Sequence, residues 1–174
     1  MTEDVRVVSL HRGEGFETAT GWQIAFKALR LVWVSDAFFA QVCYRARMRM
    51  LARGIPILPR ILHKLSMATA QMSIGDPVHL HPGIYFPHGQ VVLDGLVQIM
   101  SGTVIAPWVS IGLVSGNHKG PDIGRDCFIG TGSSLLGDFV VGDGAVVGSG
   151  AVVTKDVPDD SMVVGIPAKV VGNK

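Results

Sequence analysis

The sequence predicts a mainly β protein, in which a parallel β-helix of six-residue repeats follows a short N-terminal helical segment. Three observations predict this fold class. Aliphatic residues recur every six positions through much of residues 74–153, glycine often follows them, and a small side chain often stands four positions after them. Neither an α-helix nor ordinary strand alternation has this period. A triangular coil of three short parallel strands does, with one hexad forming each side.

The aliphatic residue of each hexad is expected to point into the prism. These residues are Ile74, Leu80, Phe86, Leu93, Ile99, Ile105, Ile111, Ile123, Ile129, Leu135, Val141, Val147 and Val153. The following glycine suits a corner where a Cβ would clash or where φ is positive. The small side chains are expected where the interior narrows, at Thr103, Ser115, Cys127, Ser133, Ala145 and Ala151. Three hexads make one coil, so we expect roughly four to five stacked coils.

The cysteines indicate a reducing, cytoplasmic location. Cys43 and Cys127 are the only two in the chain, too few for a disulfide framework or a set of metal ligands. Cys127 occupies the small inward position of its hexad, which favours a structural thiol over a nucleophile.

Composition divides the chain into four segments. Residues 1–20 are polar and lack a period, which predicts a flexible arm, and residues 21–70 are predicted to be helical. Residues 71–157 form the predicted β-helix domain, and residues 158–174 follow as a C-terminal extension.

The helical segment has its own boundary signals. Thr20 is a candidate cap for a helix that runs towards Arg53, and the pair Ser35-Asp36 is a candidate division within it. Pro59 suits the first turn of a further helix that ends near Ala70.

Charge excludes some functions and leaves one open. The net charge is +1, and no basic-aromatic module indicates a nucleic-acid partner. No apolar run is long enough to span a membrane. The helical segment does contain eight basic residues and one acid, with tryptophan and phenylalanine between them. It is either a helical unit with solvated arginines, the more common case, or a peripheral contact with the inner face of a membrane.

The repeat gains one residue in the stretch GIYFPHGQVVLDG, where His88 stands two positions after Phe86. A histidine at a loop corner is ordinarily a polar surface residue. An imidazole also titrates near neutral pH and can accept the proton of a hydroxyl as it attacks. Backbone N–H groups at such a distorted corner, near Gly89, are candidates to stabilise an oxyanion.

The hexads resemble those of the left-handed β-helix acyltransferases. The residues FPHGQVVLDG, SIGLVSGNHKGPDIGRDCFIGTGSSLLGD and VVGDGAVVGSGAVVTKDVPDDSMVVGIPAKVVG are most similar to serine acetyltransferase and its shorter relatives from surface-polysaccharide gene clusters. The resemblance covers about residues 70–172. It implies direct acetyl transfer from acetyl-CoA to a hydroxyl, with His88 as general base. It also implies a homotrimer with its sites between subunits, and no metal.

The resemblance also suggests binding residues. For acetyl-CoA, the positions that match are Gly132, Ser149, Gly150, Thr154, Lys155 and Lys169. For the acceptor, the candidates are Asp94, Trp108, Asn117 and His118. The stretch LVSGNHKGP fills a twelve-residue gap in the repeat and is expected to form an extruded loop, which suits acceptor contacts from a neighbouring subunit.

Several departures from the serine acetyltransferases bear on the acceptor. Pro87 stands where the family has an aspartate that helps hold serine, and Ser73 stands in place of the acid that orients the histidine. Asp76 and Asp94 are candidate replacements for that acid. Gly120 occupies the place of the family's second active-site histidine. We therefore expect a sugar or polysaccharide-precursor hydroxyl as acceptor, with L-serine as the alternative.

The ends of the chain differ as well. The N-terminal helical region is shorter than that of full-length serine acetyltransferases, and a stub ending Gly172-Asn173-Lys174 replaces the tail that docks into cysteine synthase. No complex with cysteine synthase is expected.

Two other classes of protein compete with this interpretation. Some left-handed β-helix proteins of the carbonic anhydrase type bind zinc through three histidines, and His79, His81 and His88 lie close together in the sequence. A non-catalytic scaffold on the same coil is the second alternative, and it predicts no binding of acetyl-CoA.

Overall fold

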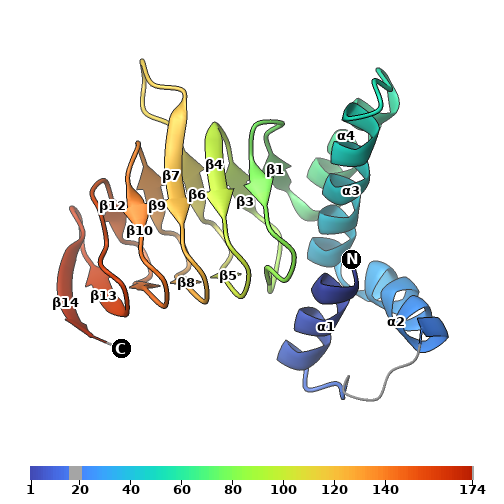
Figure 1. Ribbon diagram of the computed structural model, residues 1–174, viewed down its shortest axis with the longest axis horizontal. Helices are drawn as coiled ribbons and strands as arrows, with labels where there is room; N and C mark the ends of the chain where they lie inside the picture. The colour runs from blue at the N-terminus through green and yellow to red at the C-terminus, as the bar shows by residue number, and fades with distance from the viewer. Residues whose placement is uncertain (16–20, 174) are drawn as a thin grey trace.

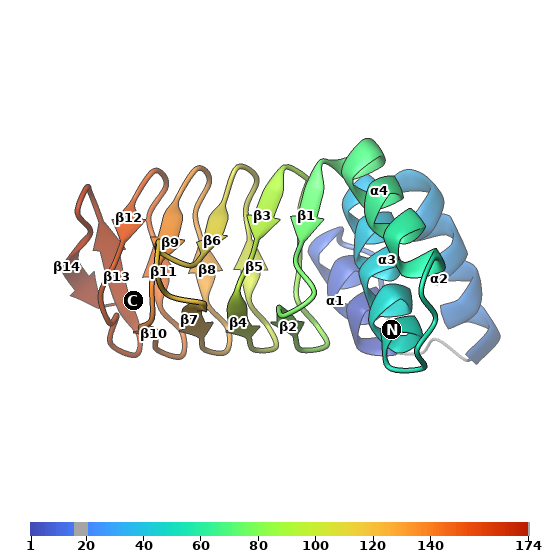
Figure 2. The same ribbon diagram turned by 90° about the horizontal axis from the view of Figure 1, so that it is seen from above.

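The computed structural model describes residues 1–15 and 21–173 and consists of a group of helices stacked on one end of a long β-helix (Figure 1). The helices in these residues are α1 Thr2–His11, α2 Gly21–Val34, α3 Asp36–Leu51 and α4 Leu58–Ala70. From the end of α4 the chain enters the prism directly and coils away from the helices, so that the last strands lie at the far end (Figure 2).

The prism is built from very short strands. They are β1 Met72–Ile74, β2 His79–Leu80, β3 Val91–Leu93, β4 Leu96–Ile99, β5 Val104–Ile105, β6 Ser110–Gly112, β7 Lys119–Ile123, β8 Phe128–Ile129, β9 Ser134–Leu136, β10 Val140–Val141, β11 Val146–Val147, β12 Val152–Val153, β13 Ser161–Val164 and β14 Lys169–Asn173. Within the described residues they form three sheets, ordered β1-β3-β6-β9-β12, β10-β7-β4-β2 and β14-β13-β11-β8-β5.

Each sheet is one face of the prism. The first face takes one strand from every coil and has five strands, so the described chain makes five coils. The strands pair in parallel, except that β14 runs antiparallel to β13. In the first face Ile74, Leu93, Ile111, Leu135 and Val153 are aligned partners from coil to coil.

The inward residues confirm the six-residue register. Each of the thirteen positions predicted to point inward, twelve aliphatic residues and Phe86, is at most 3% exposed. Five of the six predicted small inward residues are buried as well, namely Thr103, Cys127, Ser133, Ala145 and Ala151. Ser115 is the exception, because it lies in the extruded loop after β6 and is exposed. That prediction is wrong, since the coil is interrupted after Gly112 and the hexad does not continue into the loop.

Glycine at the start of a corner is required by the approach of the next coil. A Cβ on Gly142 would lie 2.2 Å from Oδ1 of Asp159, and one on Gly130 would lie 2.6 Å from the carbonyl oxygen of Val147. Neither glycine has a positive φ. Steric exclusion therefore explains these glycines, and backbone conformation does not.

The helical segment ends where its local signals indicate. The Ser35 hydroxyl accepts a hydrogen bond from the N–H of Phe38 and caps α3, so that Ser35 divides α2 from α3. Pro59 occupies the first turn of α4, and Gln71 ends that helix in the left-handed conformation with φ 53°. Thr20, the predicted cap of α2, lies outside the described residues.

The prediction of a flexible arm is wrong for residues 2–11. These residues form α1, in which Val5 and Val8 are buried in a cluster with Leu31 and Phe38. Asp4 of α1 is 1% exposed and reaches the first coil of the prism. The helix is held by these tertiary contacts, which a local sequence pattern does not contain.

The β-helix extends past residue 157. Strand β13 pairs with β11, so the fifth coil continues to Val164, and β14 then turns back along it. The predicted boundary at residue 157 therefore falls inside a coil. Among the described residues, no helix has both the length and the hydropathy needed to cross a membrane.

Candidate active site

The extra residue of the repeat lies at the corner that carries His88. Tyr85 bridges Val104 of the next coil, and the carbonyl of Gln90 accepts a hydrogen bond from the N–H of Trp108. Between these two contacts the first coil has four residues, 86–89, where the second coil has three, 105–107. The first coil therefore bulges at this corner.

The bulge is packed against the end of α4. A Cβ on Gly89 would lie 1.7 Å from the carbonyl oxygen of Ala70, the last residue of α4. The same oxygen accepts a hydrogen bond of 2.8 Å from the N–H of Gln90, which has φ 61°. The two residues that follow His88, Gly89 and Gln90, are therefore held by their backbone against the end of α4, and this contact fixes the position of His88.

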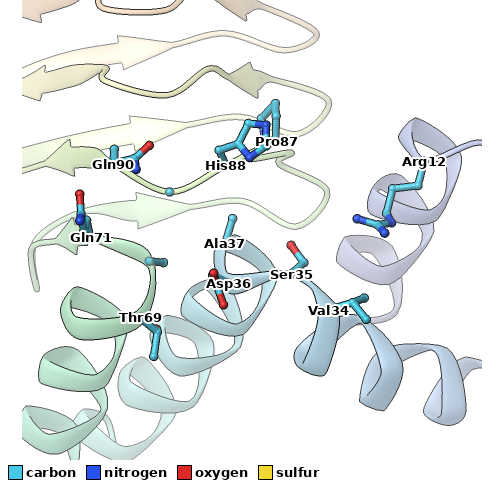
Figure 3. Close-up of a pocket in the computed structure, with 12 residues that line it drawn as sticks. Arg12, Val34, Ser35, Asp36, Ala37, Thr69, Gln71, Pro87, His88 and Gln90 are labelled. Atoms are coloured by element: carbon cyan, nitrogen blue, oxygen red, sulfur yellow. The ribbon is translucent and has the colours of Figure 1, made fainter.

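A pocket of about 300 Å³ opens beside this corner, between the first coil and the helices (Figure 3). His88 and Gln90 line it from the coil, Asp36 from the start of α3, Gln71 from the end of α4 and Arg12 from the end of α1. A cation and a carboxylate thus accompany the imidazole in one concave surface. Polar groups placed in this way can fix the orientation of a small molecule in a pocket.

The His88 ring is exposed and makes no hydrogen bond to another described residue. Likewise, within the described chain neither the His88 nor the Gly89 N–H donates a hydrogen bond. The imidazole and the two amide donors are therefore all available to a substrate.

The candidate replacements for an orienting acid have other partners. Oδ1 of Asp76 lies 3.4 Å from Nη2 of Arg47, and Oδ1 of Asp94 accepts a hydrogen bond from the N–H of Gly95. Ser73 lies on the first face of the prism, paired with Val92. Asp36 is the carboxylate that lines the His88 pocket in this chain.

Four candidate residues share the prism edge of His88. Backbone hydrogen bonds connect this edge from one coil to the next. The N–H of Trp108 donates to the carbonyl of Gln90, that of Gly132 to the carbonyl of Pro107, and that of Gly150 to the carbonyl of Thr131. Ser149 adjoins Gly150 and is exposed. Trp108 has φ 65° and is 61% exposed, so its indole is largely open to solvent at this edge.

The remaining candidates lie on another edge or at the far end. Asp94, Asn117, His118, Thr154 and Lys155 all follow strands of the first face, at the corners that lead to the second face. Lys169 lies in β14 and is exposed.

The loop at residues 113–118 is extruded as predicted. The side-chain carbonyl of Asn117 accepts a hydrogen bond from the N–H of Lys119, and Nζ of Lys119 lies 2.8 Å from Asp138. His118 is exposed, and one chain does not bring it to His88 because the two residues stand on different edges.

The three histidines of the zinc alternative do not form one group. The rings of His79 and His81 are 4.8 Å apart, edge to face, whereas His88 lies at a different corner. Burial and then the neighbouring His79 lower the pKa of His81. In the described part of the chain, no three histidine, cysteine or carboxylate side chains are placed to hold a metal ion.

Arg12, Asp36, Gln71 and Gln90 were not predicted as site residues. The sequence signal at Ser35-Asp36 marks the helix boundary but says nothing of its distance from His88. Nothing in the sequence marks Arg12, because the polar, aperiodic residues 1–20 predict a flexible arm.

Comparison with known proteins identifies a matching family and similar proteins. Residues 120–155 match the family described as bacterial transferase hexapeptide (six repeats). The chain is 31% identical over 151 residues to serine acetyltransferase of Synechococcus elongatus, covering 84% of this chain and 62% of that one. It is 31% identical over 158 residues to the Bacillus subtilis serine acetyltransferase, covering 85% and 65%.

Solved structures agree in fold. Serine acetyltransferase of Brucella abortus in complex with coenzyme A superposes with a TM-score of 0.83 at 22% identity, covering 99% of this chain and 66% of that one. Soybean serine acetyltransferase complexed with serine gives a TM-score of 0.79 at 25% identity, covering 97% and 67%.

The prism is therefore a left-handed β-helix, and its residues 120–155 match the bacterial hexapeptide transferase family. The chain is similar to the serine acetyltransferases and spans less than two thirds of the length of the two curated relatives named above.

Proposed function

We propose that this protein is an O-acetyltransferase that uses acetyl-CoA, with His88 as general base. The observation that carries the proposal is the bulged corner, which presents an unpartnered imidazole and two unpartnered amide N–H groups beside a pocket. Similarity to serine acetyltransferases, one of them solved with coenzyme A, supports the same class of reaction.

The proposed chemistry is a direct transfer. His88 accepts the proton of the acceptor hydroxyl while its oxygen attacks the thioester carbonyl carbon. The resulting oxyanion is stabilised by amide donors at residues 88 and 89. Collapse breaks the carbon–sulfur bond, and the leaving thiolate of coenzyme A receives the proton that His88 had accepted. The products are the acetyl ester and free coenzyme A.

The comparisons support L-serine as acceptor better than the sugar expected from the sequence. The relatives compared above are named serine acetyltransferases, and the soybean enzyme was solved in complex with serine. A sugar hydroxyl is kept as second candidate for two reasons. Pro87 cannot supply the carboxylate that the resemblance implies for serine, and the exposed Trp108 lies one coil away on the same edge.

A trimer with sites between subunits is part of the proposal. The candidate residues divide between two edges of the prism, so the edge of His88 in one subunit would need the His118 edge of another. The coenzyme would then lie along Gly132, Ser149 and Gly150 from one side, with Thr154 and Lys155 contributed from the other.

Peripheral membrane contact through residues 21–64 is also kept as a proposal. α2 exposes one apolar stripe of Trp22, Phe26, Leu29 and Trp33, each at least 65% exposed. Against it, Arg45 and Arg47 make internal contacts, and Arg30 pairs with Glu14, so fewer positive charges face solvent than the sequence suggested.

An acceptor screen tests the function. Purified protein would be mixed with acetyl-CoA and either L-serine or a panel of hexoses and N-acetylhexosamines, and thiol release and acetylated product would be measured. Serine-dependent release supports the first candidate, and release with sugars alone supports the second. No binding of acetyl-CoA in a thermal-shift assay would contradict both and favour a scaffold.

A further inference from the structure

A second pocket, of about 590 Å³, lies between the end of α3, the start of α4 and the first coil. It shares no lining residue with the His88 pocket. Its walls combine apolar side chains, among them Leu51, Pro56 and Pro59, with four basic side chains and one acid. The charged and titratable lining residues are Arg47, Arg60, His63, Lys64 and Asp76.

Arg47 is the buried cation of this pocket, with 3% of its surface exposed. Its guanidinium donates to the carbonyl of Ile74, and Nη1 lies 2.6 Å from Nδ1 of His63. Its Nε is buried and has no hydrogen-bond partner in the described chain. Asp76 is the one carboxylate that it meets there, at 3.4 Å.

That carboxylate compensates the buried charge only in part. Asp76 is 69% exposed, so solvent screens its interaction with the guanidinium. Burial lowers the pKa of Arg47, and the charge of Asp76 opposes this effect. A buried guanidinium is costly unless an anion and hydrogen bonds compensate it.

Two further cations face the same space. The side chains of Arg60 and Lys64 are exposed and make no hydrogen bond or ion pair with another described residue. The lining therefore carries three cations, Arg47, Arg60 and Lys64, against the single carboxylate of Asp76. No aspartate or glutamate occurs in the sequence between Asp36 and Asp76.

We propose that this pocket binds a phosphate-type oxyanion, with Arg60 and Lys64 as direct ligands and the anion compensating the buried charge of Arg47. A guanidinium and an ammonium group converging on one pocket suit phosphate oxygens. The phosphate belongs either to a soluble ligand or to a lipid headgroup. Exposed apolar residues beside the pocket, Ile57 at 70% and Ile61 at 47%, allow for the second source.

The test measures binding of inorganic phosphate to the whole chain, by calorimetry and thermal shift in a chloride-matched buffer of constant ionic strength. The variants are Arg60→Gln and Lys64→Gln, both at exposed positions that leave the core intact. Arg49→Gln is the matched control, because Arg49 is exposed on α3 but does not line the pocket. A second arm measures co-sedimentation with vesicles of phosphatidylcholine containing one quarter phosphatidylglycerol, and with pure phosphatidylcholine.

We expect phosphate to raise the melting temperature, and each pocket variant to weaken binding about tenfold while Arg49→Gln does not. Binding of anionic vesicles alone, with the same dependence on Arg60 and Lys64, supports the proposal with a lipid headgroup as source. Absence of binding in both arms would overturn it. Equal losses in Arg49→Gln and the pocket variants would overturn it too, because they would show a diffuse charge effect.

Discussion

The carbonyl oxygen of Ala70 occupies the space that a side chain at position 89 would need, 1.7 Å from the Cβ that an alanine would carry there. The last residue of α4 is therefore in direct backbone contact with the corner that presents His88. This contact joins the helical group to the proposed catalytic base, and it makes glycine obligatory at that position.

Gly89→Ala is expected to destabilise the protein by at least about 2 kcal/mol, because the neighbouring group is backbone and cannot rotate away. The same displacement would move His88 and reduce any acetyl transfer. Chemical denaturation measures the first effect. Gly172→Ala is the control, since a Cβ there meets nothing within 4 Å. Equal stability of both variants would contradict the packing described here.

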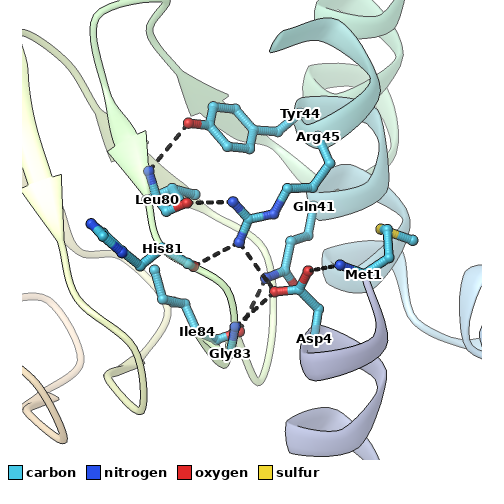
Figure 4. Close-up of polar contacts among 9 residues, drawn as sticks. All are labelled: Met1, Asp4, Gln41, Tyr44, Arg45, Leu80, His81, Gly83 and Ile84. Atoms are coloured by element: carbon cyan, nitrogen blue, oxygen red, sulfur yellow. Dashed lines mark hydrogen bonds and ion pairs between the residues drawn. The ribbon is translucent and has the colours of Figure 1, made fainter. Parts of the chain in front are cut away.

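Asp4→Ala is expected to cost about 3 kcal/mol of stability, because it leaves the largely buried Arg45 without its carboxylate. Oδ1 of Asp4 accepts hydrogen bonds from Gln41, Arg45 and the N–H of Gly83, and Oδ2 lies 3.0 Å from the Met1 α-amino group (Figure 4). Urea denaturation measures the loss. Glu3→Gln, which breaks an exposed pair with Arg6, should cost less than about 1 kcal/mol. Similar losses in both variants would show that α1 is not anchored through Asp4.

Stability should decrease as the pH falls below about 6.5, the ordinary pKa of histidine. Burial, and then the charge of Arg47, lower the pKa of His63 in the folded protein. The unfolded chain therefore binds more protons in this range, which favours unfolding as the pH falls. Denaturation midpoints between about pH 7.5 and about pH 5 measure the dependence. His63→Gln should flatten it, and an unchanged slope would show that His63 does not contribute.

Cys127 should resist alkylation while the protein is folded. It is 1% exposed, its Sγ lies 3.1 Å from the carbonyl oxygen of Gly142, and burial raises the pKa of the thiol to about 11. Thiolate is the reactive form, so iodoacetamide at neutral pH should modify it only after unfolding. Mass spectrometry of native and urea-treated protein measures this. Rapid labelling of Cys127 in the native protein would contradict an inward position.

The prism could be predicted because its information is local and periodic. Thirteen inward apolar residues repeat with few interruptions, and all of them except Phe86 are aligned in register with a counterpart one coil away. Ser115 was misplaced because the period alone does not show where a loop leaves the coil. His88 was identified from the break in the same period.

The surroundings of His88 could not be predicted, since they depend on contacts between distant residues. Nothing near Gly89 in the sequence indicates Ala70, and nothing in Thr2–His11 indicates a helix docked through Asp4. The pocket therefore combines one residue found by pattern with several supplied by tertiary packing.

The rate of acetyl transfer by His88→Ala tests the central claim most directly. His88 is exposed and has no side-chain partner in the described chain, so the variant should fold normally. With the best acceptor from the screen, we predict a fall in kcat of about 10²–10⁴-fold while coenzyme A binding is unchanged. A variant that retains the wild-type rate with that acceptor would show that His88 is not the general base.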